Sequence, residues 1–335
     1  MPFPADVTPT DALRAPFDRA PRAWSVTVLA GVALVALALV ALGSGQYPLS
    51  PLQVAGIVWQ IRMPRVGSAM LVGAALAAAG AAYQHLFRNP LVAPDTLGVS
   101  SGAALGAVLG IFLGAGYLAI ETAAFAGGLG AVVVVMFIAS RLKAHEPLVT
   151  LILTGVVVAS LLGAAISLLK YLADPYNELP AITFWLMGSF AASSPRDLAS
   201  VLPAIVLALA ALVALAWRIN LLALPEDEAR ALGVDTRRLR AAVIAAATLA
   251  TSASVAVSGI IGWVGLVVPH MARLLVGPEF SRLLPIAAIF GAIFMLVIDT
   301  IARNLSTVEI PPGILTAVVG TPVFLALLAR ATRAF

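Results

Sequence analysis

Long uncharged apolar runs recur along the chain, separated by short polar or proline-containing segments. The hydrocarbon core of a bilayer is about 30 Å thick, so a helix needs roughly 20 apolar residues to cross it. Nine runs approach or reach this length, and we interpret each as a transmembrane helix. They cover residues 24–42, 66–82, 97–118, 122–140, 148–169, 198–217, 241–261, 283–298 and 314–329.

A tenth, shorter candidate covers residues 263–276 and carries Pro269, His270 and Arg273, so hydropathy alone would reject it. The positive-inside rule gives a separate test, because Lys and Arg accumulate in cytoplasmic loops. With a cytoplasmic amino terminus and ten crossings, 15 of the 20 Lys and Arg residues lie inside and the other 5 outside. We therefore expect an all-α polytopic membrane protein with about ten transmembrane helices and both termini cytoplasmic.

The segments outside these runs define the expected domain organisation. Residues 1–23 mix aspartates and arginines, a poor match to a cationic signal peptide, and are interpreted as a cytoplasmic tail. A single transmembrane domain follows at residues 24–331, with short helices outside the bilayer at about 225–240. Residues 332–335 form a carboxyl-terminal tail.

Composition agrees with this picture and excludes several functions. Hydrophobic residues make up 61% of the chain and charged residues 11%, whereas soluble domains are about a quarter charged. There is no cysteine, and His85, His145 and His270 lie on distant segments without ligand spacing, so we expect no metal site. No phosphate-binding loop occurs, and neither Lys143 nor Lys170 follows a glycine, so the chain cannot hydrolyse ATP alone.

The segment between the second and third apolar runs, residues 84–95, contains Asn89, Pro90 and Pro94 and cannot form a continuous helix. Non-helical backbone close to a membrane survives where protein or a water-filled cavity satisfies its polar groups. The segment is therefore expected to border a transport pathway. A simple tight turn is the alternative.

The most strongly charged internal loop begins with acids and ends with bases. Glu226 and Arg230 have i,i+4 spacing, and the acidic start suits a helix amino terminus. Gly233 can end this helix before a second begins near Asp235. The pattern predicts two short helices outside the bilayer, suited to docking a motor subunit, although a solvated loop that obeys the charge rule would look similar.

Three arginines, Arg62, Arg65 and Arg303, fall on the outer side, where cations are scarce. An arginine at a helix end can extend its charged group to the membrane–water interface, and this would explain each of the three positions. Asp299 and Arg303 have i,i+4 spacing near a span end, where a charge must be paired or hydrated.

The outer loop of residues 172–195 is too short and interrupted to be a further span.

Several of these motifs occur together, in one order, over residues 25–331. They are Arg62-Met63-Pro64-Arg65, Phe87-Arg88-Asn89-Pro90-Leu91, Leu97-Gly98-Val99-Ser100-Ser101-Gly102, residues 228–240, Gly262-Trp263-Val264-Gly265-Leu266-Val267-Val268-Pro269-His270 and Asp299-Thr300. The set resembles the permease subunits of ATP-binding cassette (ABC) importers for iron-siderophores, haem and vitamin B12, the type II ABC importers.

This resemblance implies a homodimer in the bacterial inner membrane, with the translocation pathway at the dimer axis. It implies two cytoplasmic ATPase subunits, which bind ATP and Mg, and a periplasmic or lipid-anchored binding protein that delivers the substrate. The chain itself would be a transport subunit and no enzyme, would bind no cofactor and would have no nucleic-acid partner.

The resemblance also assigns roles to residues. Arg62, Arg65 and Arg303 match arginines that meet acidic residues of the binding protein. Asn89, Pro90 and Leu91 match a cytoplasmic gate loop, and Thr150 matches the start of the helix that carries the other gate. The segment that contacts the ATPases comprises Glu226, Glu228, Ala229, Arg230, Ala231, Leu232, Gly233, Val234 and Arg240.

The expected function is therefore import of a metal chelate, with ferric siderophore first and haem or cobalamin next. An oxyanion such as molybdate, carried by the same kind of importer, is an alternative. An ion-coupled secondary transporter is the main rival class. Its proton relay would need carboxylates at mid-membrane, whereas Glu121, Asp299 and Glu309 lie in loops or near span ends. A membrane-embedded enzyme is disfavoured because no nucleophile–base pair or catalytic carboxylate pair is present.

Overall fold

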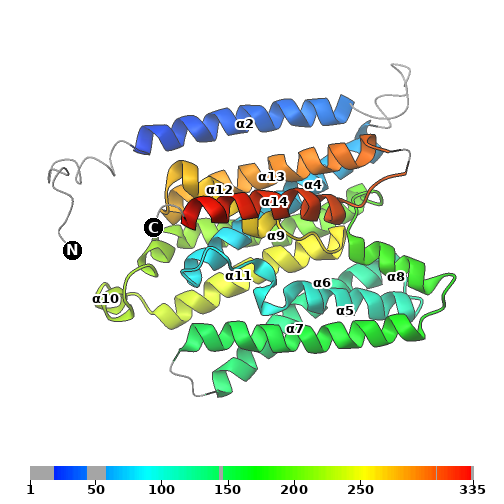
Figure 1. Cartoon of the computed structure of the whole chain (residues 1–335), viewed down its shortest axis with the longest axis horizontal. Helices are drawn as coiled ribbons and strands as arrows, with labels where there is room; N and C mark the ends of the chain where they lie inside the picture. Colours follow the sequence, from blue (N-terminus) through cyan, green and yellow to red (C-terminus); the bar gives the residue numbers. More distant parts are fainter. Residues whose placement is uncertain (1–18, 44–57, 143–145, 307, 333–335) are drawn as a thin grey trace.

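The computed structural model describes residues 19–43, 58–142, 146–306 and 308–332. All regular elements in these ranges are helical, and they pack into one bundle (Figure 1). Most of the two predicted tails, residues 1–18 and 333–335, lies outside the described residues.

Ten apolar helices correspond to the predicted spans, and seven of them are long enough to cross a membrane. The seven long helices are α2 (Arg19–Gly43), α4 (Met63–Leu86), α6 (Tyr117–Arg141), α7 (Pro147–Leu172), α9 (Pro195–Leu221), α11 (Thr236–Ser258) and α13 (Phe280–Asn304). Helix α4 is preceded by the π-helical turn η1 (Val58–Arg62). The shorter three are α5 (Val99–Phe112), α12 (Val264–Val276) and α14 (Pro312–Thr332). The all-helical, multi-pass fold is thus confirmed, and the segment at residues 263–276 is a helix.

The helices differ from the prediction in three respects. The run at residues 97–118 ends early as a helix, at Phe112, because Gly114 adopts a positive φ of 66° and α6 begins only at Tyr117. The outer loop contains a helix that we had not predicted, α8 (Glu178–Met187). The second short helix expected near Asp235 is the first part of α11, since no glycine or proline interrupts Thr236–Ser258.

Helices α4 and α11 form the centre of the bundle and are mostly buried. Alanine and glycine allow the neighbouring backbones to approach closely. A Cβ on Gly73 would overlap the carbonyl of Gly291 in α13, and a Cβ on Gly80 would overlap that of Gly265 in α12. The side of α4 that carries Gly73 and Gly80 is therefore a packing surface.

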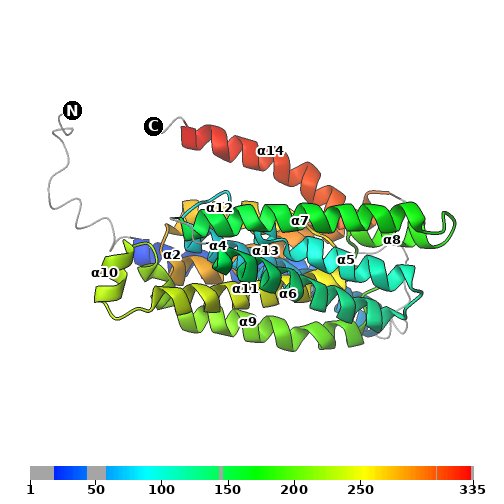
Figure 2. The same cartoon turned by 90° about the horizontal axis from the view of Figure 1, so that it is seen from below.

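The peripheral helices expose apolar side chains, as expected for surfaces that face lipid or another subunit. Helices α7 and α14 lie on one side of the bundle and α9 on the opposite side (Figure 2). On α7, Val157, Leu161 and Tyr171 are largely exposed. The start of α2, the end of α14 and the short helix α10 (Glu226–Ala231) lie towards the same end of the molecule (Figure 1).

Candidate gate, coupling and docking sites

The connection between α4 and α5 is a compact turn that exposes two of the predicted gate residues. The backbone N–H of Asn89 donates to the carbonyl of Gln84 at 3.1 Å. Its side-chain Oδ1 accepts the N–H of Leu91 at 2.9 Å, which closes a local Asx turn. Pro90 is half-buried between them, whereas Asn89 and Leu91 are exposed, Leu91 to 52%. The predicted interruption of the helix is confirmed.

The same connection continues into the 3₁₀ turn η2 (Pro94–Leu97), which packs against two further helices. The ring of Pro94 lies against Gly265 of α12, and the carbonyl of Thr96 lies against Gly155 of α7. Thr150 is in the first turn of α7, where its hydroxyl donates to the carbonyl of Glu146 at 3.1 Å. The helix that carries Thr150 therefore packs on the segment that follows Leu91.

Helix α10 projects from the apolar bundle between α9 and α11. It has six residues, and Gly233 then turns the chain with a φ of 79°. Leu232 is 62% exposed and Ala231 is also exposed, whereas Ala229 is buried against the protein. Part of the predicted coupling segment thus forms a free surface and part anchors it.

Glu226 fastens α10 to the start of α11. Its carboxylate accepts hydrogen bonds from Arg230 at 2.5 Å, from Arg240 at 3.2 Å and from the hydroxyl of Thr236 at 3.2 Å. Partial desolvation acts to raise the pKa of Glu226, but the guanidinium groups of Arg240 and Arg230 hold this pKa below its ordinary value. The carboxylate is therefore ionised at neutral pH, and its contacts join α10 to the start of α11.

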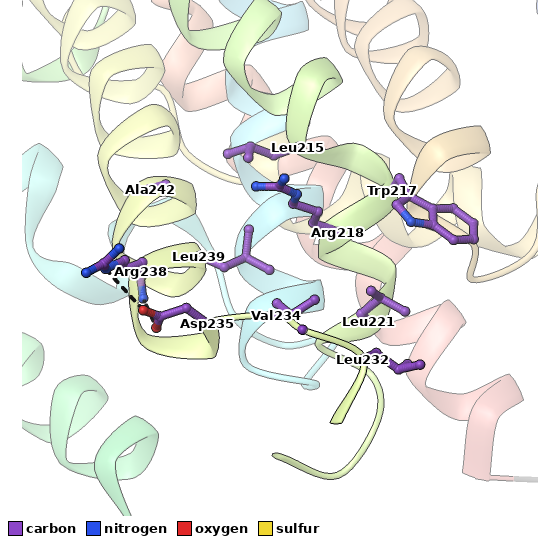
Figure 3. A pocket seen from close by; sticks show the side chains of 11 residues that line it. Leu215, Trp217, Arg218, Leu221, Leu232, Val234, Asp235, Arg238, Leu239 and Ala242 are labelled. Carbon is purple, nitrogen blue, oxygen red and sulfur yellow. Dashed lines mark hydrogen bonds and ion pairs between the residues drawn. The ribbon is translucent and has the colours of Figure 1, made fainter. Parts of the chain in front are cut away.

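A hollow of about 600 Å³ lies beside this segment, between the end of α9 and the start of α11. Leu232, Val234 and Asp235 form its edge, with Arg218 from α9 facing Leu239 from α11 (Figure 3). The surface at this end of the molecule therefore has a projecting turn next to a hollow. Such a surface is suited to contact with a folded partner.

At the opposite end of α4, a cluster of charged residues joins three segments. The guanidinium of Arg65 donates to Asp299 of α13 at 2.9 and 2.8 Å and to Glu309, before α14, at 3.0 and 2.5 Å. Arg303 pairs with the other oxygen of Asp299 at 3.1 Å. Asp299 is fully buried, and the side chains of Arg65 and Arg303 are only 11% and 12% exposed.

Two of the three predicted docking arginines thus form ion pairs within the chain. Of the two alternatives for Asp299 and Arg303, paired or hydrated, the structure shows an ion pair. The contact of Glu309 with Arg65 was not predicted, because it joins residues 244 positions apart. Arg62 is half-exposed and donates to the carbonyl of Leu42 at 2.8 Å. The structure brings all three arginines to the same end of the bundle.

These features define a class of protein: a multi-pass helical permease with a charged helix outside its apolar bundle and a broken connection beside it. The chain belongs to the FecCD transport family, whose model matches residues 28–330. It is therefore a membrane-embedded permease subunit of an ABC importer, and that subunit is not catalytic.

The chain is similar to proteins that are named for different substrates. The chain is 41% identical to the molybdate import system permease protein MolB of Haemophilus influenzae, over 90% of this chain and 94% of that protein. It is 44% identical to the cobalamin import system permease protein BtuC of Halobacterium salinarum, over 81% and 73%. A solved inward-facing structure of a putative metal-chelate type ABC transporter superposes with a TM-score of 0.87 at 40% identity, covering 91% of this chain and 99% of that one.

Proposed function

We propose that two copies of this chain form the translocation pathway of an importer in the bacterial inner membrane, with the termini in the cytoplasm. Two separate ATPase subunits drive it, and a periplasmic or lipid-anchored binding protein supplies the substrate. The observation that carries this proposal is helix α10, a charged, outward-projecting contact element between two apolar helices. The apolar faces of α7 and α14, on one side of the bundle, suit the contact between the two copies.

The outer end of the molecule is proposed to receive the binding protein through Arg62, Arg65 and Arg303. The ion pairs within the chain refine this proposal. An acidic residue of the binding protein would bind Arg62 directly but would compete with Glu309 for Arg65. Glu309 is the more accessible of the two carboxylates of Arg65, with 30% of its side chain exposed. Charge complementarity at such a surface mainly affects encounter and register.

For the cargo, we propose a metal chelate. The similarity to the solved metal-chelate type transporter supports this class, as does the similarity to the cobalamin permease. The hemin transport system permease protein HmuU of Yersinia pestis, 40% identical over 82% of this chain, extends the support to haem. A second candidate is molybdate, favoured by the MolB relative, of which the match covers 94%.

An uptake experiment distinguishes a metal chelate from molybdate as the cargo. The chain, its ATPase and its binding protein are reconstituted in liposomes, and ATP-dependent accumulation of radiolabelled molybdate, ferric siderophore, haem and cobalamin is compared. Accumulation of a chelate without molybdate supports the first candidate, and the reverse supports the second. Accumulation of none of the four would reject both.

A further inference from the structure

Arg88 connects the α4–α5 turn to the segment that leads into α10. Its Nε donates to the carbonyl of Leu222 at 2.8 Å, and a terminal guanidinium nitrogen donates to the carbonyl of Leu224. The carbonyl of Leu222 is at the carboxyl-terminal cap of α9, where the last carbonyl groups of a helix lack partners within the helix, and Leu224 lies two residues further on. A cation is favourable at that position because it also complements the helix dipole.

The backbone of Arg88 is in an unusual conformation for this residue type. Its φ is 49°, in the left-handed region that favours glycine or asparagine. Hydrogen bonds on either side hold it there, from the N–H of Arg88 to His85 at 3.2 Å and from the N–H of Asn89 to Gln84 at 3.1 Å. This conformation directs a long side chain across to α9, which a glycine could not do.

The segments at both ends of this side chain are each held by local hydrogen bonds. Asn89 and Leu91 are next to Arg88 and are closed into the Asx turn. Leu224 lies two residues before Glu226, which fixes α10 to α11. The two hydrogen bonds of Arg88 therefore give a direct mechanical path from α10 to the exposed turn.

We propose that Arg88 is a positioning residue that makes the turn of Asn89–Leu91 follow the movement of α10. This inference rests on the proposed function, since it needs an ATPase that moves α10. When α10 shifts, the carbonyls of Leu222 and Leu224 carry the guanidinium with them, and the adjoining turn opens or closes. A role limited to capping α9 would instead affect stability without changing the link between ATP hydrolysis and transport.

The first test measures transport per ATP hydrolysed in the reconstituted importer. Arg88→Ala should retain assembly and ATP hydrolysis but lower transport per ATP about tenfold, as expected from the loss of a charge-assisted hydrogen bond. Arg88→Lys should be intermediate, because one ammonium group does not reproduce the guanidinium fork. Arg141→Ala, at an exposed arginine in the last turn of α6, is the matched control and should leave the ratio unchanged.

A second test measures the distance between the Asn89–Leu91 turn and α10. It can be carried out with Arg88→Lys even where Arg88→Ala fails to assemble. The chain has no native cysteine, so spin labels at Leu91→Cys and Asp227→Cys report one distance in importers that combine one labelled copy with one unlabelled copy. With Arg88 present this distance should stay narrowly distributed when ATP binds, and with Arg88→Lys or Arg88→Ala it should broaden. Equal distributions in all variants, or an unchanged transport ratio in Arg88→Ala, would overturn the inference. An unmodified importer that does not transport with ATP would instead overturn the proposed function.

Discussion

At the scale of single residues, Arg65 has the most demanding environment of the outer charged cluster. It pairs with the fully buried Asp299 and with Glu309, so its removal leaves two carboxylates near Arg303 alone and a net negative charge in the cluster. We expect Arg65→Ala to lower the free energy of unfolding by about 3 kcal/mol. Arg62→Ala removes the same charge but only a half-exposed contact with a backbone carbonyl, so its cost should be about 1 kcal/mol or less.

The measurement is the midpoint of unfolding in a detergent titration, with Asp299→Asn added to Arg65→Ala as a rescue. Partial recovery in the double variant would identify the excess negative charge of the cluster as the cause. Equal midpoints for Arg62→Ala and Arg65→Ala would contradict the electrostatic account of the cluster.

Glu226 gives a residue-scale prediction that depends on pH. Its pKa is lowered in the folded protein, so its stabilisation of α10 is fully present above the ordinary glutamate pKa of about 4.3. The stabilisation is lost as the pH falls through the lowered pKa. A fluorophore on Asp227→Cys should therefore show high anisotropy at neutral pH and lose it on acidification.

In Glu226→Gln, the same fluorophore should already be mobile at neutral pH and should respond little to acid, because the titrating group is gone. A pH response of the same size in both chains would show that Glu226 does not hold α10.

At the scale of elements, the approach of α4 to its neighbours sets the packing of the bundle. Gly80 has no space for a Cβ against Gly265, whereas a Cβ on Gly130 of α6 would meet no atom within 4 Å. Gly80→Ala should destabilise the fold by about 1–3 kcal/mol through overpacking. Gly130→Ala is the matched helical control and should be neutral or slightly stabilising. Thermal unfolding in detergent compares them, and equal melting temperatures would be inconsistent with a tight α4–α12 contact.

The observed helices show which elements can be predicted from the sequence pattern and which cannot. Apolar runs predicted nine of the ten helices because span length is set by bilayer thickness, but they did not predict α12, which the charge bias of the loops supported. They failed at Gly114, where the apolar run continues through a left-handed turn, and at α8, whose ten residues are too few to resemble a span. The charge order predicted the short helix α10, but it did not predict that the next helix continues from Thr236 through Arg240 into the apolar bundle.

The site contacts were less accessible from sequence than the elements. Asp299 and Arg303 are four residues apart on one helix, so their pairing could be predicted. The contacts of Arg65 with Glu309 and of Arg88 with Leu222 join residues 244 and 134 positions apart, and no local pattern encodes them. Such contacts depend on how the helices pack, which the periodicity of a strongly apolar chain does not specify.

At the scale of the whole molecule, the account requires the energy source to lie outside the chain. The exposed Leu232 of the α10 turn is proposed to contact the ATPase, so Leu232→Glu should weaken that contact while leaving the apolar bundle intact. Asp227→Ala, at an exposed neighbour outside the proposed coupling residues, is the control.

The most direct test of this claim is cargo uptake by liposomes that contain the chain and its binding protein, with and without the ATPase subunits. We predict ATP-dependent uptake only when the ATPase is present, no ATP hydrolysis by the purified chain, and uptake abolished by Leu232→Glu but retained in Asp227→Ala. Uptake driven by an ion gradient without the ATPase, or ATP hydrolysis by the chain alone, would contradict the account.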